Sequence, residues 1–150
     1  VTGMVAGLGT ITPASGFIGP GGALVLGLLA GIVCFSATMY IKRVLKIDDS
    51  LDVFPVHGVG GILGTFLAGI LSATSLGVFS GYGFAEGNET MVDQLAVQVI
   101  GIVVVFIFTA AVTWLLLKLV DAITGLRVSE EEEIQGLDIN SHEERGYDIH

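Results

Sequence analysis

One histidine lies inside a long apolar run, and two acids stand just before it. His57 follows Asp49 and Asp52, and after Asp52 no residue that is charged at neutral pH occurs until Glu86. About twenty apolar residues follow, which is enough for one helical crossing of a bilayer. An ionisable side chain at membrane depth is costly and typically marks a path for ions or protons. The alternative is a neutral imidazole that only packs between helices.

The expected depth and facing of His57 favour a role in a path for ions or protons over a packing role. If Asp49 caps the helix and Ser50 is its first residue, His57 lies about 11 Å along the axis, towards the middle of a hydrocarbon layer about 30 Å thick. Val53 precedes His57 by one helical turn, and the residues that follow on the same face are small: Gly60, Gly61, Gly64 and Ala68. Small residues on one face of a helix leave room for a neighbouring helix or a lumen. We therefore expect His57 to face protein or a channel.

Burial in a low dielectric favours the uncharged imidazole, which offers one donor and one acceptor. No other polar side chain of this helix shares its face, so we expect its partner to come from another segment. Pro55 cannot donate to the carbonyl of Leu51, which predicts a kink or a loosened turn just before His57. For the two acids we predict structural roles, with Asp49 as helix cap and Asp52 in the first turn. Recruitment of cations at the inner mouth is the alternative.

The composition indicates an all-α membrane protein. Of 150 residues 52% are hydrophobic and 14% are charged, and the mean hydropathy is +0.82. A soluble chain this apolar would have too little polar surface to present to water. The net charge of -9 arises mostly after residue 120, where Glu130 to Glu133 stand together.

Other chemistry is not indicated. The single cysteine, Cys34, allows no internal disulfide, and packing is its expected role. The sequence carries no nucleophile-base pair, metal-ligand cluster or phosphate-binding loop. We therefore expect no enzyme activity, no cofactor, no metal and no nucleic-acid partner.

Four membrane segments and a polar tail are expected. Apolar runs separated by glycine and proline place the four segments at about 1–17 (the end of a truncated helix), 23–41, 51–73 and 95–120. The membrane domain is then 1–121, and the tail is 122–150. Cations follow the second and fourth segments, whereas the loop 74–93 has no Lys or Arg, which predicts a cytoplasmic carboxyl terminus. The apolar opening without Met predicts a fragment of a longer protein. Thr12 beside Pro13 is expected to cap the end of the first helix, with a functional role as the alternative.

The tail allows two readings. Its four consecutive glutamates alone predict a disordered acidic segment. However, apolar residues and turn formers flank the acids, in Gly125-Leu126-Arg127-Val128 and Gly136-Leu137-Asp138-Ile139. This pattern favours a tail that packs on the cytoplasmic face.

Several motifs, in order along nearly the whole chain, resemble the carboxyl-terminal part of an ammonium transporter of the Amt/Mep/Rh family, in its prokaryotic Amt branch. They are Gly7-Leu8 with Ile11-Thr12-Pro13-Ala14-Ser15-Gly16, Gly21-Gly22-Ala23-Leu24, Asp48-Asp49-Ser50-Leu51-Asp52-Val53-Phe54 with His57-Gly58-Val59-Gly60-Gly61, Phe84-Ala85-Glu86-Gly87, and the two tail motifs. The resemblance implies a protomer of eleven transmembrane helices, usually trimeric, in the cell (inner) membrane. This chain would hold about the last four helices and the cytoplasmic tail.

The resemblance also implies roles for single residues. His57 matches the second of two histidines that line the pore, Val53 matches an apolar pore-lining position, and Asp49 and Asp52 match acids at the cytoplasmic end of that helix. The tail is implied to regulate transport and to meet neighbouring protomers and PII-type signalling proteins, through Arg127, Gly136, Leu137, Asp138, His142 and Tyr147. Two departures occur: Pro55 stands where the family has glycine, and Glu143 and Gly146 replace small residues of a His-Gly-Glu-x-Ala-Tyr pattern.

The function expected from these features is ammonium transport. Ammonium would lose its proton outside, and ammonia would cross a hydrophobic pore that is lined by the histidine pair; methylammonium is a further candidate substrate. Loss of the hydration shell makes passage of the intact cation through such a pore expensive. Two alternatives remain: a relative that senses ammonium, and an ion-coupled secondary transporter with a discontinuous helix near Pro55.

Overall fold

The computed structural model describes residues 2–144, which are helical or irregular and include no strand. Two compact units divide the chain at residues 105 and 106. The first unit contains three helices and the beginning of a fourth: α1 (Thr2–Ile11), α2 (Pro20–Tyr40), α3 (Gly60–Leu71) and α4 (Met91–Thr124). The second unit contains the rest of α4 and two short helices, α5 (Glu130–Gln135) and α6 (Leu137–His142). The predicted all-α fold is confirmed.

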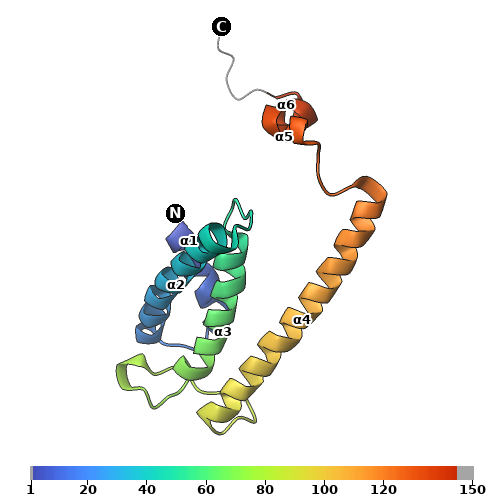
Figure 1. The fold of residues 1–150 in the computed structure, drawn as a ribbon. Coiled ribbons are helices and arrows are strands. Elements are labelled where there is room, and N and C mark those ends of the chain that lie inside the picture. The colour runs from blue at the N-terminus through green and yellow to red at the C-terminus, as the bar shows by residue number, and fades with distance from the viewer. Residues whose placement is uncertain (1, 145–150) are drawn as a thin grey trace. The chain divides into compact units, whose positions relative to one another are not determined.

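Buried residues at every fourth position, most of them small, form the contacts between α1, α2 and α3. The three helices contact one another in pairs (Figure 1). Ridges formed by residues four apart interdigitate at such contacts, and small residues let the backbones approach. The buried ridges are Ala6, Thr10 and Ala14 in and after α1, Gly22, Leu26, Ala30 and Cys34 in α2, and Gly60, Gly64 and Ala68 in α3.

The closest approach is between α1 and α3. A Cβ atom added to Gly64 would overlap the carbonyl oxygen of Thr10, and one added to Gly60 would lie 2.7 Å from the Thr10 hydroxyl oxygen. Glycine is therefore required at Gly64 by a backbone contact with the neighbouring helix.

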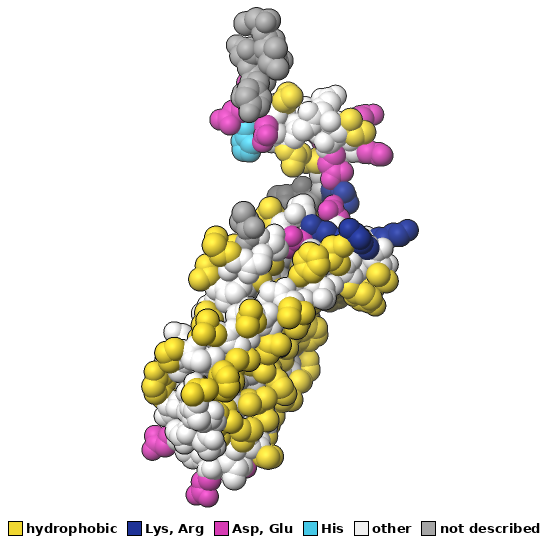
Figure 2. Space-filling view, turned by 90° about the vertical axis from the view of Figure 1, so that its left-hand side faces the viewer, with side chains coloured by type: hydrophobic (Ala, Val, Ile, Leu, Met, Phe, Trp, Pro, Cys, Tyr) yellow, Lys and Arg dark blue, Asp and Glu magenta, His cyan; other side chains and the backbone are white. Residues whose placement is uncertain are grey.

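Much of the first unit's surface is apolar. Figure 2 shows hydrophobic side chains over most of the visible face of this part of the chain, with charged side chains near its ends. Large exposed residues such as Leu24, Leu28 and Ile32 follow one side of α2. Such a surface suits a lipid environment and would be unusual for a soluble protein.

Within residues 2–144, three helical stretches are long and apolar enough to cross a membrane: Pro20–Leu45, Phe54–Leu71 and Met91–Thr124. The first begins before the expected 23 and continues through a π-helical turn, Ile41–Leu45. The last exceeds the expected 95–120 at both ends. The first segment, expected over 1–17, forms only the ten-residue α1 and a 3-10 turn, Thr12–Ala14, because Pro13 ends the α-helical pattern.

The segment that contains His57 also differs from expectation. Its helix begins at Val53 rather than at Ser50 or Leu51, and it opens with a π-helical turn, Phe54–Val59, before α3 proper. Residues 72–90 then form a loop with one 3-10 turn, Gly77–Phe79, and the loop returns to the α1–α2 connection, where the N–H of Tyr82 donates to the carbonyl of Phe17 at 3.0 Å.

Candidate functional site

The carboxylate of Asp49 caps the helix that carries His57. Its two oxygens accept the backbone N–H groups of Val53 and Phe54 at 2.8 and 2.9 Å. These are donors that a helix leaves unpaired in its first turn. The helix begins at Val53, later than the position of Asp49 in the sequence suggests. The Asp49 carboxylate nevertheless accepts these N–H groups from four residues before Val53.

Asp52 lies immediately before the helix and not in its first turn. Its backbone is left-handed, with φ +56°, which non-glycine residues rarely adopt. Its carbonyl accepts the N–H of Val56 at 3.0 Å, and its carboxylate Oδ1 lies 2.6 Å from Lys42 Nζ. Lys42 belongs to the π-helical turn at the end of α2, so this ion pair joins the two ends of the loop between α2 and α3.

Pro55 and His57 share the π-helical turn Phe54–Val59. Pro55 has no N–H to donate, and a wider turn is one way in which a helix accommodates the missing bond. The loosened turn that the proline predicts is therefore present, and it contains the histidine. π-Helical turns of this kind often occur at functional sites.

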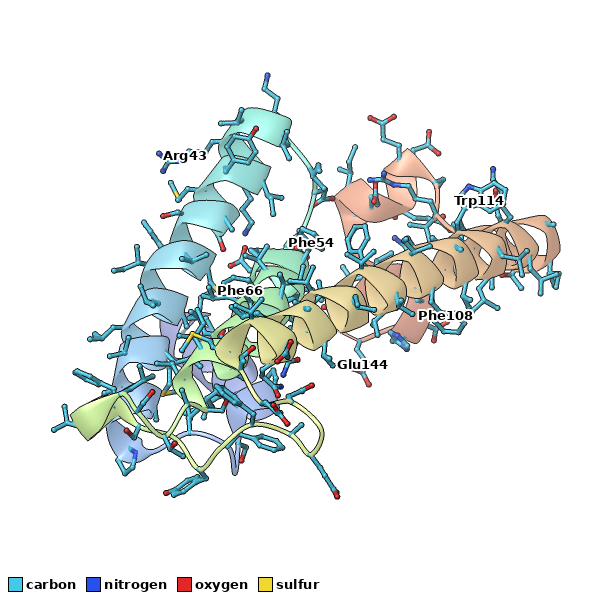
Figure 3. All side chains as sticks on the ribbon, turned by 90° about the horizontal axis from the view of Figure 1, so that it is seen from below. Arg43, Phe54, Phe66, Phe108, Trp114 and Glu144 are labelled. Carbon is cyan, nitrogen blue, oxygen red and sulfur yellow. The ribbon has the colours of Figure 1, made fainter. Side chains whose placement is uncertain are left out.

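The side chains of Val53, Phe54 and His57 are all exposed, whereas Pro55 and Val56 between them are buried. Val53 is 52% exposed and Phe54 51%. The Phe54 ring extends from the start of this helix and packs against Gly58, where an added Cβ would lie 3.0 Å from the ring (Figure 3). The exposed faces of these three residues form one surface, which we call the His57 face.

Gly9 of α1 lies beside His57. A Cβ added to Gly9 would lie 3.8 Å from His57 Nδ1 and 3.7 Å from the carbonyl oxygen of Val56. Nothing in the sequence pattern singled out this glycine, because the contact joins residues that are 48 positions apart. Spacing along one helix gives no information about such a contact.

Thr12 lies directly after α1 and begins the 3-10 turn Thr12–Ala14. Its hydroxyl donates to the carbonyl of Leu8 at 2.8 Å. A threonine hydroxyl one turn along satisfies a carbonyl at a helix end. The geometry therefore matches the capping alternative.

The predicted tail residues form a separate group in the second unit. The Arg127 guanidinium binds Glu133 in a fork, with its Nη2 at 2.9 and 3.2 Å from the two carboxylate oxygens. Gly136, with φ +100°, connects α5 to α6. The remaining predicted residues with described positions, Leu137, Asp138 and His142, lie in α6. Tyr147 lies outside the described residues.

A reciprocal cap begins α5. The hydroxyl of Ser129 accepts the N–H of Glu132, and the Glu132 carboxylate accepts the backbone N–H and the hydroxyl of Ser129 at 2.9 and 2.8 Å. The backbone N–H of Ser129, and then its hydroxyl, hold the pKa of the Glu132 carboxyl below its ordinary value of 4.5.

Comparison with known proteins identifies the family. The model of the Ammonium Transporter Family matches residues 1–147. The chain belongs to this family. The resemblance seen in the motifs is thereby confirmed, and with the apolar helices it indicates a multi-pass membrane protein.

Curated relatives of this ammonium transporter family member cover almost all of the chain. A putative ammonium transporter of Methanothermobacter thermautotrophicus is 46% identical over 98% of the chain, and the ammonium transporter Amt1 of Archaeoglobus fulgidus is 45% identical over 98%. The ammonium transporter of Bacillus subtilis is 35% identical. The chain spans 36% of the length of each of these three relatives.

A solved structure extends the similarity to the fold. A protein titled Sensor Amt Protein matches 93% of this chain with a TM-score of 0.81 and 33% sequence identity. The match covers 33% of that protein's chain. The fold is therefore a partial ammonium-transporter fold, as the sequence predicted.

Proposed function

We propose that this chain forms part of the conduction path of an ammonium transporter. The observation that carries the proposal is the exposed His57 on a π-helical turn inside a stretch with enough apolar residues to cross a membrane. A titratable side chain that faces lipid would cost free energy, whereas the same side chain in a lumen can contact the substrate or a proton. Family membership supports ammonium as the substrate.

The His57 face supplies two kinds of surface to a small polar molecule. Val53 and Phe54 are apolar and discourage a hydrated cation, because its lost water is not replaced. An imidazole in its neutral form would offer one hydrogen-bond donor and one acceptor at His57. In the proposed mechanism ammonium loses its proton outside, and ammonia passes His57 and a second histidine of another segment. The proton stays behind or travels along the histidine pair.

The two acids before the helix act as structural supports in this proposal. Both oxygens of Asp49 are bonded to backbone N–H groups, and Asp52 faces Lys42. Carboxylates with these partners are poorly placed to recruit a cation at the inner mouth. Their role is to fix the start of the helix and thereby the position of His57.

The experiment that tests this function is uptake of labelled methylammonium by cells without transporters of their own that express the full-length protein. His57→Ala should abolish uptake or change its selectivity radically. A matched control is Ile62→Ala, which truncates an exposed apolar side chain elsewhere on the same segment. Uptake by His57→Ala at the rate and selectivity of the unmodified protein would remove His57 from the mechanism.

Ammonium sensing is the second candidate, because the matched structure is titled a sensor. A sensor that uses the same fold would bind ammonium and need not conduct it. Binding of ammonium to the purified full-length protein without uptake by cells would favour this candidate, and uptake would exclude it as the sole function.

The placement in the cell follows from the same proposal. We place the protein in the cell (inner) membrane as a homotrimer, with the region after residue 121 in the cytoplasm. The cations of the α2–α3 loop agree with this orientation. In this proposal Arg127, Gly136, Leu137, Asp138, His142 and Tyr147 belong to a regulatory tail that meets neighbouring protomers and PII-type proteins. Truncation before Arg127 should impair transport or its regulation.

A further inference from the structure

We draw no further inference here: the strongest candidate, the apolar groove that Val33 of α2, Ile62 and Phe66 of α3, and Ile102 of α4 line, carries none, because the chain spans 36% of the length of its curated relatives and nothing in residues 2–144 shows what covers the groove.

Discussion

Replacing Gly64 by alanine should destabilise the protein through a collision between two backbones. The added Cβ would overlap the carbonyl oxygen of Thr10 and lie 3.3 Å from Pro13 Cγ. A side chain could rotate away, but a carbonyl in a helix cannot, so α1 and α3 must separate. We therefore take the cost at the upper end of the usual range for overpacking, about 3 kcal/mol.

A gain in helix propensity offsets part of this cost. Alanine stabilises a helix interior by about 1 kcal/mol relative to glycine, which leaves a net loss of about 2 kcal/mol for Gly64→Ala. Gly61→Ala, three residues earlier, receives the same gain, and no other part of the described chain lies within 4 Å of its added Cβ. The two variants should therefore differ by about 3 kcal/mol in stability.

The assay is thermal unfolding of the full-length protein in detergent, followed by the fraction that remains monodisperse after heating. The apparent melting temperature should be lowest for Gly64→Ala and highest for Gly61→Ala, with the unmodified protein between them. A Gly64→Ala protein that is as stable as the unmodified one would show that α1 and α3 do not touch at Thr10, and the packing described above would be wrong.

Three further predictions concern the supports of the site and the tail. Asp49→Ala should cost about 1–2 kcal/mol in thermal stability, because two helix N–H groups lose their acceptor, and substrate selectivity in uptake assays should not change. Lys42→Met and Asp52→Asn should each lower stability by up to about 1 kcal/mol, since the pair is partly exposed, and a double-mutant cycle without coupling would exclude the ion pair. Because the Glu132 pKa is lowered in the folded cap, its contribution to α5 is complete above the ordinary value of 4.5 and is lost as pH falls through the lowered value; amide exchange near Ser129 should accelerate there, and Glu132→Gln, which cannot titrate, should remove this pH dependence.

Local signals predicted the helices and the cap of the candidate site. The apolar runs gave the three long segments, because a membrane helix needs only length and hydropathy. Asp49 was a predictable cap because its type and position precede an apolar run. The loosened turn at Pro55 was predictable because proline lacks an N–H.

Contacts between distant segments were not predictable. The start of the helix at Val53 depends on the left-handed Asp52 and its ion pair with Lys42, two features that no local pattern indicates. Likewise, Gly9 beside His57 and Thr10 against Gly64 depend on how α1 packs on α3. The glycines at these positions show that something approaches closely, but they do not show which residue approaches.

The central claim is that the His57 ring lies in the conduction path, and the position of that ring in an experimental structure of the full-length protein in a lipid nanodisc tests it most directly. We predict that the imidazole lines a continuous lumen through the protomer, with the Nδ1 edge facing Gly9. An imidazole that faces lipid acyl chains, or that is sealed in protein far from any lumen, would contradict the account.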